Sequence, residues 1–309
     1  MTEKPLAAVL GLDVIGASLA LALKQSGQYD AVVAWDPDYD TARRAQQQHV
    51  ADRFASRAEE AVAGAAVIFL AVGAGHVREV MAAVAPHLRP GAVVCSLSES
   101  HEATAALAQD ILPPQVSFAS GHPVLWEAVT AGTTPSAALF QRGVFCLSPL
   151  PTAHPDAVAF LSSLAGTLGA DAYFMDAREH DAFFSGVGRL PAILACALLR
   201  VVSREPSWRE LSRLAGGDFR QVTAPAEAEP GRQQEALAAE REHVVRWLEA
   251  MVDELSRLRD ALQDGQEPAD FFTGAAEIRR RWLRDRQTPP AVAEAPGLPP
   301  ETGRRRFPW

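Results

Sequence analysis

The sequence predicts an α/β fold in which a doubly wound parallel sheet is followed by an all-helical region. Three observations carry this prediction. A short apolar run, Leu6–Leu10, leads through closely spaced glycines into a helix-like run, Ala17–Lys24. A second run, Ala65–Val72, is apolar throughout, which is typical of a parallel strand buried on both faces. Beyond Met175 the strand-like runs end and helical periodicity takes over.

The segment Gly11–Gly16, here called the glycine turn, predicts a dinucleotide-binding unit of the Rossmann type. Its residues are Gly11, Leu12, Asp13, Val14, Ile15 and Gly16. They connect a strand to a helix, and a cofactor pyrophosphate sits at the N-terminus of such a helix. Asp13 stands where the G-x-G-x-x-G pattern has its middle glycine, so a carboxylate is expected beside the pyrophosphate dianion.

The next apolar run, Asp30–Trp35, predicts a second strand that ends at Asp36. Asp36 lies about 20 residues beyond the glycine turn, where this fold places the carboxylate that binds the adenosine ribose hydroxyls. This spacing favours NAD over NADP. Alternatively, Asp36 only begins a turn with Pro37. Arg43 and Arg44 follow and could bind a 2′-phosphate, so NADP stays possible.

Strands and helices alternate through the first half of the chain. The strand Ala65–Val72 ends at Gly73-Ala74-Gly75, small residues suited to a loop that passes close to a ligand, so we expect Val72 and Gly73 to contact the cofactor. A helix is predicted over His76–Leu88. Further strands are predicted over Ala92–Leu97, Ser117–Ser120, Val144–Ser148 and Asp171–Phe174.

The second half of the chain is predicted to be helical. Asp181–Val202 is expected to form one apolar helix. Apolar residues then recur at steps of three and four and form a seam that requires a partner helix: Val244, Leu248, Met251, Leu255, Leu258 and Leu262. A last helix is expected over Ala269–Arg286. The predicted domains are residues 1–175, 176–286 and a disordered, proline-rich tail over 287–309.

Composition excludes several classes of protein. The net charge of −9 and the pI near 5.4 argue against a nucleic-acid partner, which requires a basic face. The N-terminus lacks signal-peptide features and no uninterrupted apolar run reaches the length of a membrane span, so we expect a cytoplasmic protein without a membrane partner. The cysteines, Cys95, Cys146 and Cys196, are widely spaced, which favours reduced thiols over a disulfide or a metal site.

Five motifs in register resemble those of prephenate and arogenate dehydrogenases, over roughly residues 5–286. They are VLGLDVIGASLALALK, IFLAVG, SGHP, the helical Arg189-Leu190-Pro191, and GGDFRQVT. The resemblance implies an NAD- or NADP-dependent oxidative decarboxylation of a cyclohexadienyl acid on the path to tyrosine. It also implies a helical domain that forms a homodimer.

The same resemblance assigns the candidate site residues. His122 matches the histidine of the family's Gly-His-Pro motif, and a neutral imidazole is a natural acceptor for the hydroxyl proton lost in the reaction. Arg220 matches an arginine that would hold a substrate carboxylate. Arg189 could bind a further anion, and Ser98 could supply a hydroxyl near the reacting centre.

Three residues depart from the family pattern at positions that contact ligands: Asp13 replaces a glycine, Glu99 a serine and Arg189 a histidine. His101 also stands where the family has a lysine. Two functions are therefore compared. In the first, the protein is a dehydrogenase that uses His122. In the second, it is a catalytically silent homologue, a dimer that binds a small anion or a protein. A different NAD(P)-dependent reductase with the same sheet fits the downstream motifs less well.

Overall fold

The computed structural model describes residues 4–129 and 132–287. They fall into two compact units, which meet in sequence between His180 and Asp181. The first is called the sheet unit and the second the helical unit, and each is described by itself. The predicted tail, apart from Gln287, lies outside the described residues.

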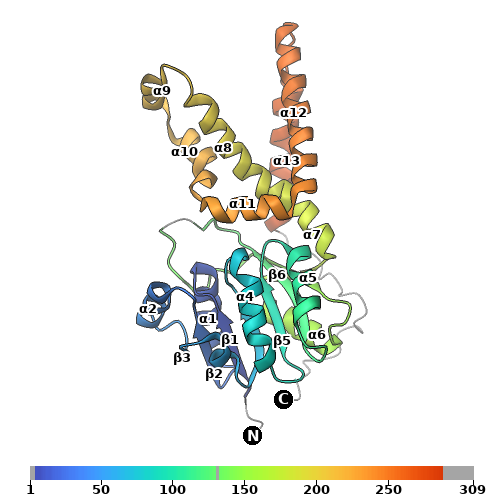
Figure 1. The fold of residues 1–309 in the computed structure, drawn as a ribbon. Coiled ribbons are helices and arrows are strands. Elements are labelled where there is room, and N and C mark those ends of the chain that lie inside the picture. Colours follow the sequence, from blue (N-terminus) through green and yellow to red (C-terminus); the bar gives the residue numbers. More distant parts are fainter. Residues whose placement is uncertain (1–3, 130–131, 288–309) are drawn as a thin grey trace. The chain divides into compact units, whose positions relative to one another are not determined.

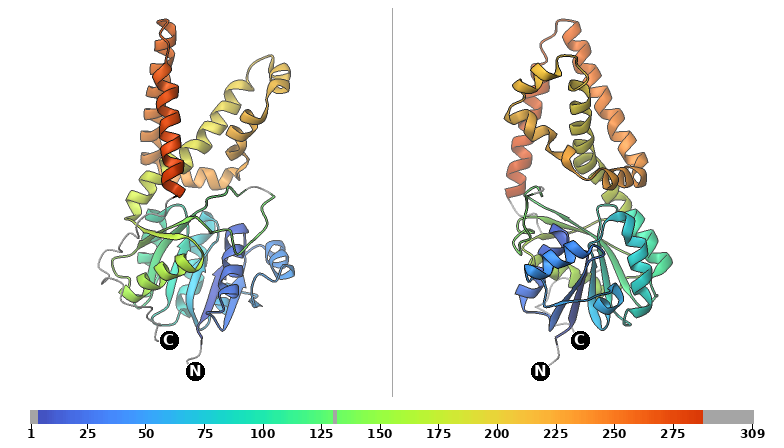
Figure 2. Two further views of the ribbon diagram at one scale, coloured as in Figure 1. Left: turned by 180° about the vertical axis from the view of Figure 1, so that it is seen from behind. Right: turned by 60° about the vertical axis from the view of Figure 1, so that its left-hand side comes forward.

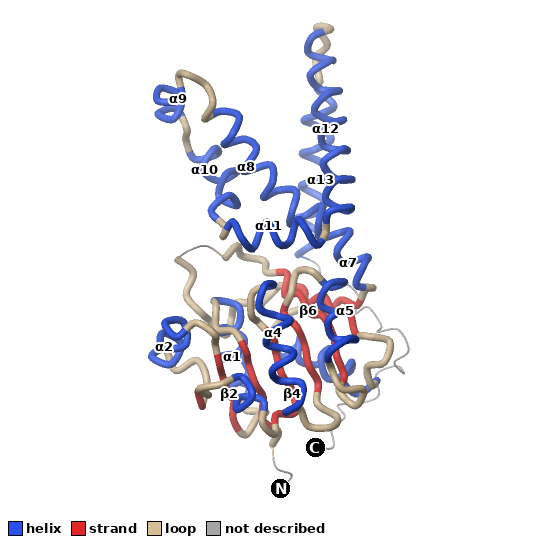
Figure 3. The backbone as a smooth tube through the Cα atoms, viewed as in Figure 1, coloured by secondary structure: helices blue, strands red, loops and turns tan. Residues whose placement is uncertain are grey.

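The sheet unit holds one eight-stranded sheet with the order β3-β2-β1-β4-β5-β6-β7-β8 (Figure 1; strands are red in Figure 3). Its strands are β1 (Leu6–Leu10), β2 (Ala31–Trp35), β3 (Arg53–Phe54), β4 (Ala65–Leu70), β5 (Val93–Leu97), β6 (Ser117–Val124), β7 (Val144–Pro149) and β8 (Asp171–Phe174). Its helices are α1 (Val14–Ser26), α2 (Tyr39–Gln47), α3 (Ala58–Val62), α4 (Ala74–Val84), the short η1 (Ala85–His87), α5 (His101–Ile111) and α6 (Pro155–Thr167).

Helices cover both faces of this sheet (Figure 2). One core cluster packs Leu19 of α1 and Leu161 of α6 against strand residues such as Phe69. The other packs Met81 of α4 and residues of α3 and α5 against Ile68 and its neighbours. All six residues of β4 are buried, as expected for a central parallel strand. The predicted doubly wound sheet is therefore confirmed.

One strand pair departs from the predicted parallel sheet. Strand β6 runs antiparallel to β7, whereas the other neighbouring pairs are parallel. A parallel neighbour requires a crossover, usually a helix, but no helix occurs in the described part of the connection from Val124 to Val144. Strand β6 is also longer than predicted and includes Gly121-His122-Pro123.

The helical unit begins within α7 (Ala177–Phe184), which continues through a π-helical turn (Ser185–Arg189) into α8 (Leu190–Val202). The predicted helix over Asp181–Val202 ends at the predicted residue but begins earlier, at Ala177, and its hydrogen bonding changes at this turn. The remaining elements are α9 (Trp208–Leu214), α10 (Gly217–Thr223), η3 (Ala224–Glu227), α11 (Pro230–Ala239), α12 (Arg241–Gln263) and α13 (Ala269–Gln287).

One described helical stretch, Ala177–Val202, is long and apolar enough to cross a membrane by length and composition. A core helix of a soluble protein meets the same criterion, and one such helix argues only weakly for a membrane. Only 17% of its apolar window is buried within this chain. The helix therefore has an apolar surface that its own chain leaves uncovered.

Candidate active site

The glycine turn connects β1 to α1 and packs directly on the end of β4. Gly11 adopts a φ of +102°, and a Cβ atom there would collide with the backbone of Ala71. A Cβ atom on Gly16 would collide with the carbonyl oxygen of Gly11. Both glycines are therefore required by close backbone approach. Val72 is buried beside this contact, and Gly73 is the N-cap of α4, whereas Ala74 and Gly75, also predicted to lie in a loop, belong to the helix.

Asp13 is the N-cap of α1. Its Oδ1 accepts hydrogen bonds from the backbone N–H groups of Ile15 and Gly16, each at 3.0 Å. Its φ of −61° and ψ of −177° are extended, so the backbone does not require glycine at this position. The Asp13 carboxylate consequently occupies N–H groups at the helix N-terminus, where a dinucleotide pyrophosphate binds in this fold.

Asp36 holds the glycine turn to the end of β2. One of its carboxylate oxygens accepts the Leu12 N–H at 2.6 Å, and the other accepts the Asp38 N–H at 2.8 Å. The second bond closes a local turn at Asp36, which is the alternative role that the sequence suggested for this residue. Burial raises the pKa of Asp36 and the charges of Asp38 and Asp13 add to this, while the two backbone hydrogen bonds oppose it.

The predicted cofactor residues therefore lie together at the carboxyl ends of β1, β2 and β4. The backbone path of the glycine turn and the place of Asp36 fit a dinucleotide. Asp13 does not fit a dinucleotide as well, because its carboxylate is bonded to the backbone N–H groups that the pyrophosphate would use. Arg44, one of the two arginines considered for NADP, donates instead to the Thr41 hydroxyl at 2.8 Å.

His122 lies on β6 and is 6% exposed. Its Nδ1 lies 3.0 Å from Nε2 of His180, so these two atoms share one hydrogen. If His122 donates this hydrogen, its own Nε2 is left with a lone pair and can accept a proton. In that tautomer His180, on α7, would orient the His122 ring, and the role of His122 as a base stays a prediction.

A third histidine, His101 at the start of α5, stacks on His180. The ring centroids are 3.6 Å apart and the planes differ by 7°. His101 is fully buried, and its Nδ1 lies 2.7 Å from the Ser148 hydroxyl. Burial, followed by the nearby His180 and His122, lowers the pKa of His101 to about 2, so its ring is neutral.

This histidine cluster (His101, His122 and His180) was only partly expected. The sequence motif identified His122, and His101 was visible only as the residue at the family's lysine position. No sequence pattern distinguished His180, which lies 58 residues from its partner His122. Strand β6 and helix α7 bring the two rings together, and such a contact leaves no local signal.

Ser98 lies next to the strand that carries His122. Its backbone N–H donates to the carbonyl of Gly121 at 3.1 Å, and its hydroxyl accepts the Ser100 N–H at 3.1 Å. Glu99, at the family's serine position, is exposed. Ser98 is thus hydrogen-bonded to the strand that carries His122, whereas Glu99 is exposed, and substrate binding by Ser98 stays a prediction.

Arg189 and Arg220 belong to the helical unit. Arg189 donates through Nη2 and Nε to the two oxygens of Glu240, at 2.9 and 3.2 Å. The Glu240 side chain is 1% exposed and also accepts the Ser185 hydroxyl at 3.0 Å. Arg220 lies exposed on α10. Substrate binding by both arginines stays a prediction, and for Arg189 it would involve a guanidinium already paired with a carboxylate.

The doubly wound sheet, the glycine turn and the buried imidazole pair define a dinucleotide-dependent dehydrogenase. The chain matches the profile of the prephenate dehydrogenase nucleotide-binding domain over residues 19–174 and that of its dimerization domain over residues 176–275. It therefore belongs to the prephenate dehydrogenase family. The predicted family and enzyme class are confirmed.

Individual relatives agree with this assignment. The chain is 26% identical over 276 residues to a cyclohexadienyl dehydrogenase of Zymomonas mobilis, covering 88% of this chain and 94% of the relative. It is 22% identical to a prephenate dehydrogenase of Bacillus subtilis, covering 87% of this chain and 74% of the relative.

Solved structures show the same fold. The Aquifex aeolicus prephenate dehydrogenase complex with hydroxyphenyl propionate and NAD+ superimposes with a TM-score of 0.81 at 18% identity, covering 92% of this chain and 99% of that one. The Synechocystis arogenate dehydrogenase gives a TM-score of 0.74 at 22% identity, covering 90% and 99% of the two chains.

Proposed function

We propose that this protein catalyses the NAD-dependent oxidative decarboxylation of a cyclohexadienyl acid, either prephenate or arogenate. The observation that carries the proposal is the buried His122–His180 pair, because it supplies a base beside the sheet that holds the cofactor residues. Bound NAD+ supplies a hydride acceptor for the ring carbon that carries the hydroxyl, and the ring carboxylate leaves as CO2.

The protein's part in this reaction is to take the hydroxyl proton. His122 accepts it at Nε2 while its Nδ1–H donates to His180. The imidazolium that forms is then stabilised by the hydrogen bond to His180, whose ring is fixed by stacking on His101. Ser98, beside Gly121, is the proposed second hydrogen-bonding group for the substrate hydroxyl.

Asp36 supports NAD as the cofactor. Its partly buried carboxylate lies with Asp13 and Asp38 at the expected ribose site, and a 2′-phosphate would meet three like charges there. We keep Arg220 as the proposed partner of a substrate carboxylate, with Arg189 as a second anion-binding candidate.

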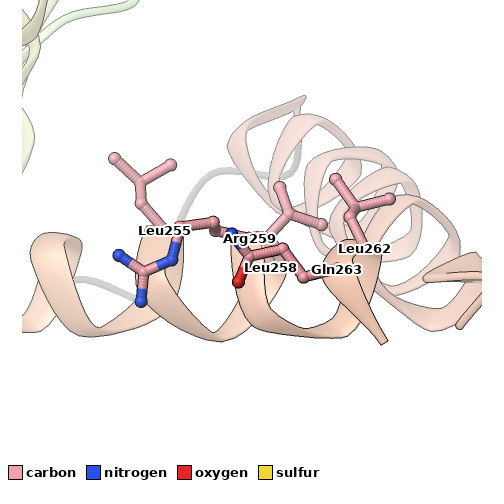
Figure 4. A pocket seen from close by; sticks show the side chains of 5 residues that line it. All are labelled: Leu255, Leu258, Arg259, Leu262 and Gln263. Carbon is pink, nitrogen blue, oxygen red and sulfur yellow. The ribbon is translucent and has the colours of Figure 1, made fainter. Parts of the chain in front are cut away.

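The helical unit supports a homodimer, as the family's dimerization domain implies. The predicted seam is buried at Val244, but Leu255 and Leu262 are 52% and 56% exposed. Figure 4 shows that Leu255, Leu258 and Leu262 line a shallow hollow on α12 together with Arg259 and Gln263. A second copy of α12 would cover this apolar surface. We place the dimer in the cytoplasm.

Turnover tests the function directly. The purified protein, mixed with prephenate or arogenate and either NAD+ or NADP+, should produce the reduced cofactor at 340 nm, faster with NAD+. His122→Ala should lower kcat about 10²- to 10⁴-fold without weakening NAD+ binding. His76→Ala, at an exposed histidine on α4, is the matched control. NAD+ binding without turnover on either substrate would instead support the catalytically silent homologue.

A further inference from the structure

We infer that the Asp13 carboxylate is a built-in competitor of the cofactor pyrophosphate, and that NAD binds by displacing it from the start of α1. This inference rests on the proposed function, since it concerns the same cofactor. It assigns to Asp13 the role of setting cofactor affinity, which the glycine of the family pattern does not have.

The first step concerns the hydrogen-bond donors. Asp13 Oδ1 accepts both the Ile15 and the Gly16 N–H, and these groups lie in the first turn of a helix of 13 residues. A pyrophosphate at this position uses donors of the same helix N-terminus. The same N–H groups cannot bind both anions at full strength, so one anion must leave when the other binds.

The second step concerns charge. The charge of Asp13 helps to raise the pKa of Asp36, and Asp36 is anchored to the glycine turn through the Leu12 N–H. A dianion that enters this turn therefore meets a carboxylate on its own donors as well as the carboxylate expected for the ribose. The positive end of the α1 dipole is already partly neutralised by Asp13.

The third step concerns the ligand-free protein. An aspartate N-cap stabilises its helix, and replacing it with alanine destabilises the helix. Asp13 thus stabilises the ligand-free turn by the same hydrogen bonds that oppose the cofactor. Removing the Asp13 side chain should therefore lower the stability of the ligand-free protein and raise its affinity for NAD+. A residue with a purely structural role would lower the stability only.

The experiment measures both effects in full-length variants. NAD+ affinity is measured by calorimetry, and the Tm of the ligand-free protein by circular dichroism. Asp13→Asn keeps a capping side chain but removes the charge, so NAD+ should bind about tenfold more tightly with Tm within about 1 °C of wild type. Asp13→Ala removes both the cap and the charge. It should bind NAD+ at least as tightly as Asp13→Asn, with Tm lowered by about 2–4 °C.

Asp52→Asn is the matched control for net charge. Asp52 accepts the Val32 N–H at 2.8 Å near the amino end of β2, the end of the strand opposite Asp36, and its variant should leave NAD+ affinity unchanged. If wild type binds NAD+ and neither Asp13 variant binds it more tightly, the competition is refuted and the proposed function survives. If no folded variant binds NAD+, both the competition and the NAD-dependent function fail.

Discussion

Acid should destabilise the sheet unit through His101. This ring is fully buried and its pKa is about 2, against about 6.5 for an exposed histidine. Because the folded pKa lies below the unfolded one, the unfolded chain takes up a proton at His101 before the folded protein does. The stabilisation by neutral His101 is therefore complete above about pH 6.5 and is lost as the pH falls towards 2.

The size of this effect follows from the two pKa values. Between pH 7 and pH 5, linkage at one such histidine removes about 2 kcal/mol from the free energy of unfolding. His101→Asn has no titrating ring at this position. Between pH 7 and pH 5 its free energy of unfolding should therefore fall by about 2 kcal/mol less than that of wild type. Urea unfolding at both pH values, followed by circular dichroism at fixed protein concentration, measures the difference.

His76→Gln controls for the loss of an exposed histidine and should keep the wild-type pH dependence. If His101→Asn loses as much stability between pH 7 and pH 5 as wild type, then His101 is not held neutral by burial. The proposal that the His180 ring is fixed by stacking on a neutral His101 would then be wrong.

Two further predictions concern stability. Glu240→Ala should lower the free energy of unfolding by about 3–5 kcal/mol in a denaturant titration, because the 14%-exposed Arg189 loses its carboxylate partner. Adding Arg189→Ala to this variant should recover part of the loss. Strictly additive effects of the two substitutions would show that the pair is not coupled. Gly16→Ala should abolish NAD+ binding or folding, measured by calorimetry and circular dichroism, because its Cβ would meet the Gly11 carbonyl. Gly166→Ala, in α6 with open space around the added Cβ, should be tolerated, and wild-type behaviour of Gly16→Ala would contradict the collision.

The sequence predicted those parts of the fold that depend on local patterns. Strand β1 has the predicted bounds, since the apolar run is followed directly by Gly11. Strand β6 extends beyond the predicted Ser117–Ser120 to Val124 and includes Pro123, a residue type that normally argues against an interior strand position. Its pairing with β7, which continues through Pro123 opposite Phe145, overrides that local preference.

The site was less predictable than the fold. The glycine turn, Asp36 and His122 each carry a motif, and the structure places them at the carboxyl ends of strands or on β6. The contacts of His180 with His101 and of Glu240 with Arg189 join distant segments. Contacts of this kind depend on tertiary packing, and neither residue type nor spacing indicates them in a single sequence.

Residues that depart from the family pattern have acquired partners within their own units. Asp13 caps α1, and Arg189 is paired with Glu240 inside the helical unit. His101, at the family's lysine position, is a neutral ring bonded to Ser148. An unpartnered buried charge would destabilise the fold, whereas the charged groups of Asp13 and Arg189 have hydrogen-bond partners. We therefore expect these departures to affect cofactor and substrate affinities before they affect stability.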